Sequence, residues 1–337
     1  MRGLPILGLM LFTLGACSAN VSSPGESDAD ALTQTTAVVT FERTTTTGEA
    51  GHEIVRGAAT ARFVQARSPW YAGSQTSQAF QISGLDDRAL KLVGAAFDAP
   101  PSFGCVALSD ELDAAAGRAL ELADVGGLQV VQTSGQTALG ARTFPLVARQ
   151  VPDPVGLVGG VIYYAPAASV EPGSQVIPGS RYSVRAAGSP GVASFEISGA
   201  APLDVSDVRL ASANAGAPNA RVAIPAQAVS VELAWSTADA SVARETGDVF
   251  FVDVAVQRGA GSTGGTLRCA ADASGATIPG SAFSALPPDG EGTFAVHRVH
   301  RERVRAGTAP TSSSPRGPLE SSELRFDFSR VIAFSRR

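Results

Sequence analysis

The residues of this chain that could do chemistry are few, and the histidines come first among them. Of three histidines, His297 and His300 are separated by two residues and His52 stands alone. Residues three apart on a strand point to opposite faces, so one metal ion could not easily reach both His297 and His300. His52-Glu53 begins like a zinc protease motif, but Arg56 occupies the place of its second histidine. The sequence therefore predicts no metal and no cofactor, and a solvated strand around His297 and His300.

An arginine-rich run follows directly. Residues 297–305 contain four arginines, which are Arg298, Arg301, Arg303 and Arg305. Guanidinium groups bind phosphates through paired hydrogen bonds, so the run could contact lipopolysaccharide phosphates or an acidic polymer. The alternative is an edge strand whose charges prevent unwanted strand pairing. We favour the edge strand and keep these arginines as candidate ligand contacts.

Familiar catalytic motifs are missing from the sequence. There is no Gly-x-Ser-x-Gly, and Lys91, the single lysine, follows Leu90 rather than the glycine of a phosphate loop. Neighbouring carboxylates are explained better by surface turns than by a glycosidase cleft. We therefore expect no enzyme, and a structural or interaction role. One alternative is a polysaccharide-binding module using the loop-like aromatic pair Trp70-Tyr71; another is an enzyme of an undetected family.

The first element to place is the N-terminal segment. Arg2 supplies a positive charge, an apolar run extends from Leu4 to Leu14, and small residues follow. This pattern is typical of an export signal, and the run is too short to span a bilayer, which takes about 20 residues. We assign residues 1–16 to a signal peptide and the polar, acidic residues 17–36 to a flexible linker.

The residues Leu14-Gly15-Ala16-Cys17 resemble the lipobox of bacterial prolipoproteins. The resemblance implies that cleavage before Cys17 leaves this cysteine lipidated and anchored to a membrane; the alternative is a plain secretory signal that contains a cysteine. Ser18 is not the Asp that retains such proteins in the inner membrane, so the resemblance implies the outer membrane. Its periplasmic or cell-surface face stays open. Beyond the membrane, the expected partners are an envelope polysaccharide or another envelope protein. A net charge of −5 argues against nucleic acid.

The rest of the chain reads as short strands separated by turns rich in its 36 glycines and 21 prolines. Alternating apolar residues, such as Val229, Val231, Leu233 and Trp235, indicate half-buried strands. We predict an all-β fold of two consecutive β-sandwich (immunoglobulin-like) domains, residues 37–187 and 188–337. Only Leu108 to Ala123 could form a helix of any length.

The second half carries a further resemblance. Tyr182-Ser183-Val184, Leu233-Ala234-Trp235, Leu267-Arg268-Cys269 and Ile278 to Phe283 are similar to a sandwich in uncharacterised predicted lipoproteins of soil bacteria. The resemblance implies fold and location only.

Two cysteines remain besides Cys17. Cys105 and Cys269 would meet an oxidising compartment after export, which allows a disulfide. Sequence does not supply the geometry that a bridge requires, so two independently buried cysteines are the alternative.

Overall fold

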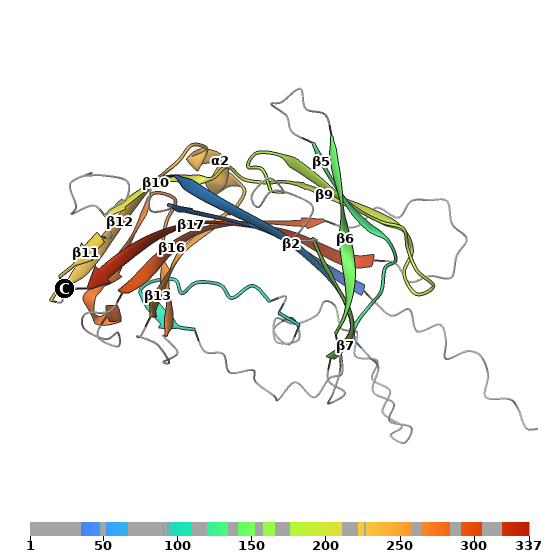
Figure 1. Ribbon diagram of the computed structural model, residues 1–337, viewed down its shortest axis with the longest axis horizontal. Helices are drawn as coiled ribbons and strands as arrows, with labels where there is room; N and C mark the ends of the chain where they lie inside the picture. The colour runs from blue at the N-terminus through green and yellow to red at the C-terminus, as the bar shows by residue number, and fades with distance from the viewer. Residues whose placement is uncertain are drawn as a thin grey trace, which may run out of the picture. The chain divides into compact units, whose positions relative to one another are not determined.

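The computed structural model describes residues 35–47, 52–66, 90, 93–94, 96–108, 120–133, 141–151, 158–165, 176–210, 222–225, 227–257, 265–283, 291–304 and 319–336. These residues form an all-β, sandwich-like fold, which confirms the predicted fold class (Figure 1). The proposed signal peptide, residues 17–34 of the proposed linker and the candidate strand Ala79–Ile82 lie outside the described residues, whereas Thr35 and Thr36, assigned to the linker from sequence, begin the first strand.

The strands of the first half are β1 (Thr35–Thr47), β2 (Glu53–Ala66), β3 (Cys105–Ala107), β4 (Leu120–Leu122), β5 (Leu128–Thr133), β6 (Arg142–Val151), β7 (Val158–Tyr164), β8 (Arg181–Ala186) and β9 (Phe195–Ala200). Those of the second half are β10 (Val205–Leu210), β11 (Val222–Ile224), β12 (Ser230–Thr237), β13 (Val249–Gln257), β14 (Thr266–Ala270), β15 (Gly275–Pro279), β16 (Glu291–Val304) and β17 (Leu319–Arg336). A short helix, α2 (Ala240–Glu245), and a 3-10 turn, Gly280–Phe283, complete the described elements. At the end of the predicted helix, Leu120–Leu122 form strand β4 instead, and residues 109–119 lie outside the described residues.

The long strands at the two ends of the folded chain pair with each other. β1 runs parallel to β17, with Phe41 opposite Phe326, and antiparallel to β2. β16 lies on the other side of β17, and β13 follows it. The large sheet continues in the order β3-β14-β13-β16-β17-β1-β2-β4-β7-β6-β5-β8-β9, while β10, β12 and β15 form a separate small sheet. Figure 1 shows β16 and β17 as long neighbouring ribbons, and β2 as another long ribbon of the same sheet.

Two hydrophobic cores lie on one face of these long strands. The first core joins side chains of β5, β8 and β9 to those of β1, β2 and the first half of β17. The second core joins β10, β12 and β15 to β13, β16 and the second half of β17. Because β17 contributes to both cores, residues 33–337 form one compact unit. The pairing of β8 with β9 crosses the position 187/188 at which the sequence analysis places a domain boundary.

Period-two alternation predicts the core-facing residues of β12 and β13 well. Val231, Leu233 and Trp235 are buried in the second core. Val229 was expected on the same face but is 90% exposed. The reason is that β12 begins at Ser230, so the alternation of the strand does not extend to Val229.

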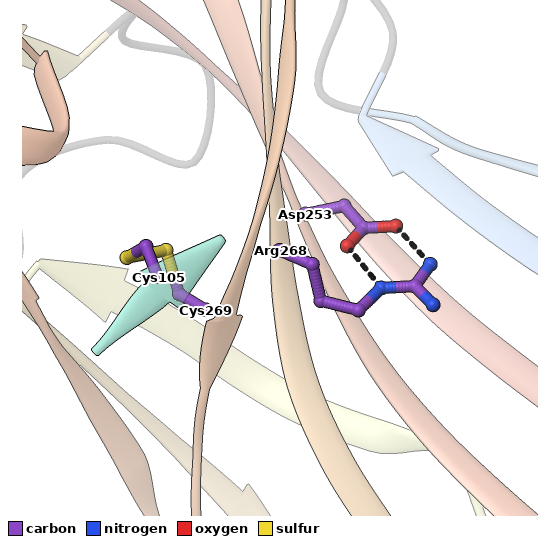
Figure 2. The surroundings of a disulfide bond; sticks show 4 residues. All are labelled: Cys105, Asp253, Arg268 and Cys269. Carbon is purple, nitrogen blue, oxygen red and sulfur yellow. Dashed lines mark hydrogen bonds and ion pairs between the residues drawn. A yellow bond between two sulfur atoms is a disulfide. The ribbon is translucent and has the colours of Figure 1, made fainter. Parts of the chain in front are cut away.

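A disulfide joins Cys105 to Cys269, across 164 residues of sequence. The two cysteines lie directly opposite each other where β3 pairs with β14, with a Cα–Cα distance of 4.0 Å. This finding settles the alternative left open by the sequence. Figure 2 shows that Arg268, the residue before Cys269, lies on the other side of β14 and pairs with Asp253 of β13.

Candidate functional site

Several residues singled out by sequence lie outside the described part of the chain. They are the lipid acceptor Cys17, the aromatic pair Trp70 and Tyr71, and Arg305. Their proposed roles therefore stay predictions. The structure does describe Arg298, Arg301 and Arg303, all of which lie on β16.

β16 is an interior strand of the large sheet. It pairs with β13 on one side and with β17 on the other, so that Arg298 lies between Phe250 and Phe328. β13 flanks this run only from His297 to Val299, so the interpretation as an edge strand is wrong for Arg298, whereas from His300 to Val304 the described pairing is with β17 alone. The charged side chains of β16 divide between the two faces of the sheet, because side chains alternate along a strand.

Arg298 points to the core-facing side and is buried, with only 1% of its side chain exposed. Its Nη1 donates to Asp239 at 2.5 Å and to the Leu203 carbonyl at 3.0 Å, and its Nε donates to Asp248 at 2.6 Å. Burial alone would lower the pKa of Arg298, but the hydrogen bonds that it donates to Asp239 and Asp248 raise it. The prediction that Arg298 contacts a ligand is wrong, because its guanidinium is already enclosed by these partners.

Asp248 is the centre of this buried group. Its side chain is fully buried, and it accepts hydrogen bonds from Arg298 and from Thr246. The ring Nδ1 of His300 lies 2.7 Å from Asp248 Oδ1. Burial alone would raise the pKa of Asp248, but His300, Thr246 and Arg298 together lower it. The group ties β16 to the start of β13 and to the residue before α2.

His297 lies on the opposite face of β16, as the strand spacing predicts. Its Nδ1 is 2.8 Å from Asp327, its Nε2 is 3.7 Å from Asp253, and its ring stacks on Phe251 at 4.5 Å. Burial would lower the pKa of His297, but the nearby Asp327 and Asp253 raise it. The solvated-strand interpretation is wrong, since only 16% of the His297 side chain is exposed. Among the described residues, no group of histidines, cysteines and carboxylates could hold a metal.

The face that carries His297 also gathers arginines from neighbouring strands. Arg301 donates from Nε and Nη2 to the two carboxylate oxygens of Glu323, at 2.9 and 2.7 Å. Arg325 donates to Glu323 Oε1 at 2.8 Å, and Arg303 Nε lies 3.7 Å from Oε2. Burial would raise the pKa of Glu323, but Arg301 and Arg325 lower it. We call Arg301, Arg303 and Arg325, with Glu323, the arginine cluster.

The segment before β3 covers part of the arginine cluster. The Phe97 ring centroid lies 4.7 Å from the guanidinium carbon of Arg301 and 5.4 Å from that of Arg325. The Ala96 carbonyl accepts a hydrogen bond from Arg325 at 3.2 Å. These contacts fix the planes of two arginines against one aromatic ring. Arg301 and Arg325 therefore have partners within the protein that hold their positions.

Sequence reasoning found Arg301 and Arg303 but missed Arg325 and Glu323. A signal was present, because β17 alternates apolar Leu324, Phe326 and Phe328 with charged residues between them. That alternation indicates a charged face. The sequence does not show that this face pairs with the arginines of β16.

No described helix is long and apolar enough to cross a membrane. No protein-family model matches this chain, and no curated protein matches it either.

Proposed function

We propose that this chain is an exported lipoprotein, anchored in the outer membrane through lipid on Cys17, with a non-catalytic interaction role. The lipobox-like residues Leu14 to Cys17 supply the anchor, and residues 17–34 connect it to the folded part, which begins with β1 at Thr35. The periplasmic or surface face is not part of the proposal.

The observation that carries the proposal is the disulfide between Cys105 and Cys269. Disulfides form and persist in oxidising compartments and are rare where thiols are kept reduced. A bridged pair inside the fold therefore supports export, as the N-terminal segment does independently.

The interaction role is supported by how the charged groups of β16 are used. Arg298, His297 and His300 are held in ion pairs that tie neighbouring strands together. Arg303, by contrast, keeps 78% of its side chain exposed beside the arginine cluster. The exposed charge is therefore available to a partner, while the buried charges stabilise the sheet.

The test is fractionation of a Gram-negative host that expresses the full chain. The wild type and a Ser18→Ala control are expected in the membrane pellet after a carbonate wash, with acyl label incorporated. Cys17→Ala is expected in the soluble fraction without label, because the acceptor thiol is gone. Retention of Cys17→Ala in the membrane would contradict the anchor.

A second variant tests the membrane to which the protein is sorted. By the resemblance to lipoproteins, Ser18→Asp is expected to move the protein from the outer to the inner membrane fraction on a density gradient. An unchanged distribution would remove the support for outer-membrane sorting.

A further inference from the structure

The arginine cluster lies on one face of two adjacent strands, β16 and β17. Strand register places Arg301 opposite Arg325, and Arg303 opposite Glu323. Residues opposite each other in a sheet project from the same face and lie about 5 Å apart. β1 extends the same two rows through Thr40, which is opposite Arg325.

β2 brings a fourth arginine to this face. Arg62 lies opposite Val38, which in turn lies opposite Glu323. Its Nη1 donates to Thr60, while its buried Nε has no hydrogen-bond partner among the described residues. Burial lowers the pKa of Arg62, and the negative charge of Glu42 acts against that effect. Arg62 is thus a cation next to the cluster that Glu323 does not neutralise.

The charge of the cluster itself is unbalanced. Glu323 is within 4 Å of Arg301, Arg303 and Arg325, and it is the carboxylate that the three share. Within the cluster three guanidinium groups share this one carboxylate, and Glu42, on the same face of β1, acts electrostatically on Arg325 and Arg62. The oxygens of Glu323 are already occupied by Arg301 and Arg325. Arg303, 3.7 Å away, therefore has donors left for another anion.

The arrangement also supplies free, oriented donors. Arginine carries five N–H donors in a rigid fork. Arg301 uses Nε and Nη2 on Glu323, and among the described residues its Nη1 has no hydrogen-bond partner. The guanidinium groups of Arg301 and Arg325 lie over the Phe97 ring, and this contact lowers the cost of ordering them on binding. Arg303 stands beside them in the neighbouring row.

We infer that the arginine cluster binds a phosphate monoester, with Arg303 and Arg301 as its direct contacts. A phosphate monoester carries a charge of about −2 near neutral pH, which suits two guanidinium groups whose donors Glu323 does not saturate. Its three acceptor oxygens can accept hydrogen bonds from two guanidinium groups at once, whereas a carboxylate offers two oxygens. The inference rests on the proposed function for its biological setting, where the monoester belongs either to a lipid headgroup or to a soluble phosphorylated sugar.

The test uses the full mature chain with Cys17→Ala, because the acyl anchor would itself bind lipid vesicles. Isothermal titration with glucose 1-phosphate is compared with glucose 6-sulfate, a monoanion. Binding of the phosphate is expected to be about tenfold tighter, since it carries the second charge. Equal affinities for the two sugars would overturn the inference. So would the absence of binding both to glucose 1-phosphate in titration and to phosphatidic acid vesicles in flotation.

Matched charge reversals locate the site. Arg303→Glu is expected to weaken binding by about tenfold or more. Arg181→Glu, an equal charge change at an exposed residue of β8, is expected to leave it within about twofold. Both variants should melt like the parent, because both side chains are exposed. Binding that Arg303→Glu does not weaken would refute the site.

Vesicle flotation distinguishes the two sources of the monoester. Phosphatidic acid vesicles are compared with phosphatidylglycerol and phosphatidylcholine vesicles. Flotation only with phosphatidic acid identifies a lipid headgroup, and binding of glucose 1-phosphate without flotation identifies a soluble sugar phosphate. Neither result depends on Cys17, so failure here and failure of the membrane anchor are separate outcomes.

Discussion

Replacement of Arg298 by alanine should be among the most destabilising single changes in this fold. The guanidinium is 1% exposed and bonds to Asp239 and Asp248. Removing it leaves Asp248, with 0% of its side chain exposed, facing His300 and Thr246 as its remaining side-chain partners in the described part of the chain. Asp239 is 19% exposed and can recover part of its hydration. The main cost therefore comes from the uncompensated charge of Asp248.

The expected magnitude follows from this burial. Breaking a buried ion pair by removing one partner costs about 3–5 kcal/mol. The matched control is Arg303→Ala, on the same strand but 78% exposed and 3.7 Å from its carboxylate. That change should alter the free energy of unfolding by no more than about 0.5 kcal/mol. The two arginines, five residues apart, should thus differ by several kcal/mol.

The assay is urea unfolding of both variants, together with Asp248→Asn and the double variant Arg298→Ala/Asp248→Asn. The double variant should lose less stability than the sum of the single variants, because neither buried charge is left alone. The folded-state pKa of Asp248 is lowered, so its contribution is present above pH 3.8 and is lost as pH falls through the folded pKa. The deficit of Arg298→Ala should therefore shrink in acid. If Arg298→Ala cost no more than Arg303→Ala, the buried-network account would be refuted.

Three further changes test other parts of the structure. Replacing Cys105 and Cys269 together by alanine should lower the free energy of unfolding by up to about 5 kcal/mol, because the disulfide closes a loop across a separation of 164 residues. Urea titration would measure this loss, and a loss below about 1 kcal/mol would contradict the prediction. His297 has a raised pKa, so its contribution is fully present below its unfolded pKa of 6.5 and is lost as pH rises through the folded pKa. His297→Gln should thus be more destabilising at about pH 5.5 than at about pH 9, and a pH-independent effect would count against the ion pairs. Gly160 has φ +119°, and a Cβ there would lie 2.0 Å from a carbonyl oxygen of β4. Gly160→Ala should therefore lower the free energy of unfolding by on the order of 2 kcal/mol or more. The control Gly191→Ala, at a residue with open space around it, should be nearly neutral in thermal melts.

Local patterns were enough to predict the strands but not their pairing. Period two identifies the buried faces of β12 and β13, because a half-buried strand must alternate. The pairing of β1 with β17 joins residues almost 300 positions apart, for example Phe41 and Phe326. No local pattern encodes such a contact, and the expected boundary at 187/188 reflects that limit.

The same limit explains the outcome at the site. Arg298 follows Phe294 and Val296 on one alternating face, so its burial could have been inferred from β16 alone. Its partners Asp239 and Asp248 could not, because they reach it across other strands. Likewise the charged positions of β17 are visible in sequence, but their meeting with Arg301 depends on register.

The most direct test of the central proposal is the mass of the mature N-terminus. The full chain would be purified from bacterial membranes, digested, and its N-terminal peptide measured by mass spectrometry. The account predicts that this peptide begins at Cys17 and carries the added mass of a diacylglycerol and an amide-linked acyl chain. A peptide that begins elsewhere, or an unmodified Cys17, would contradict it.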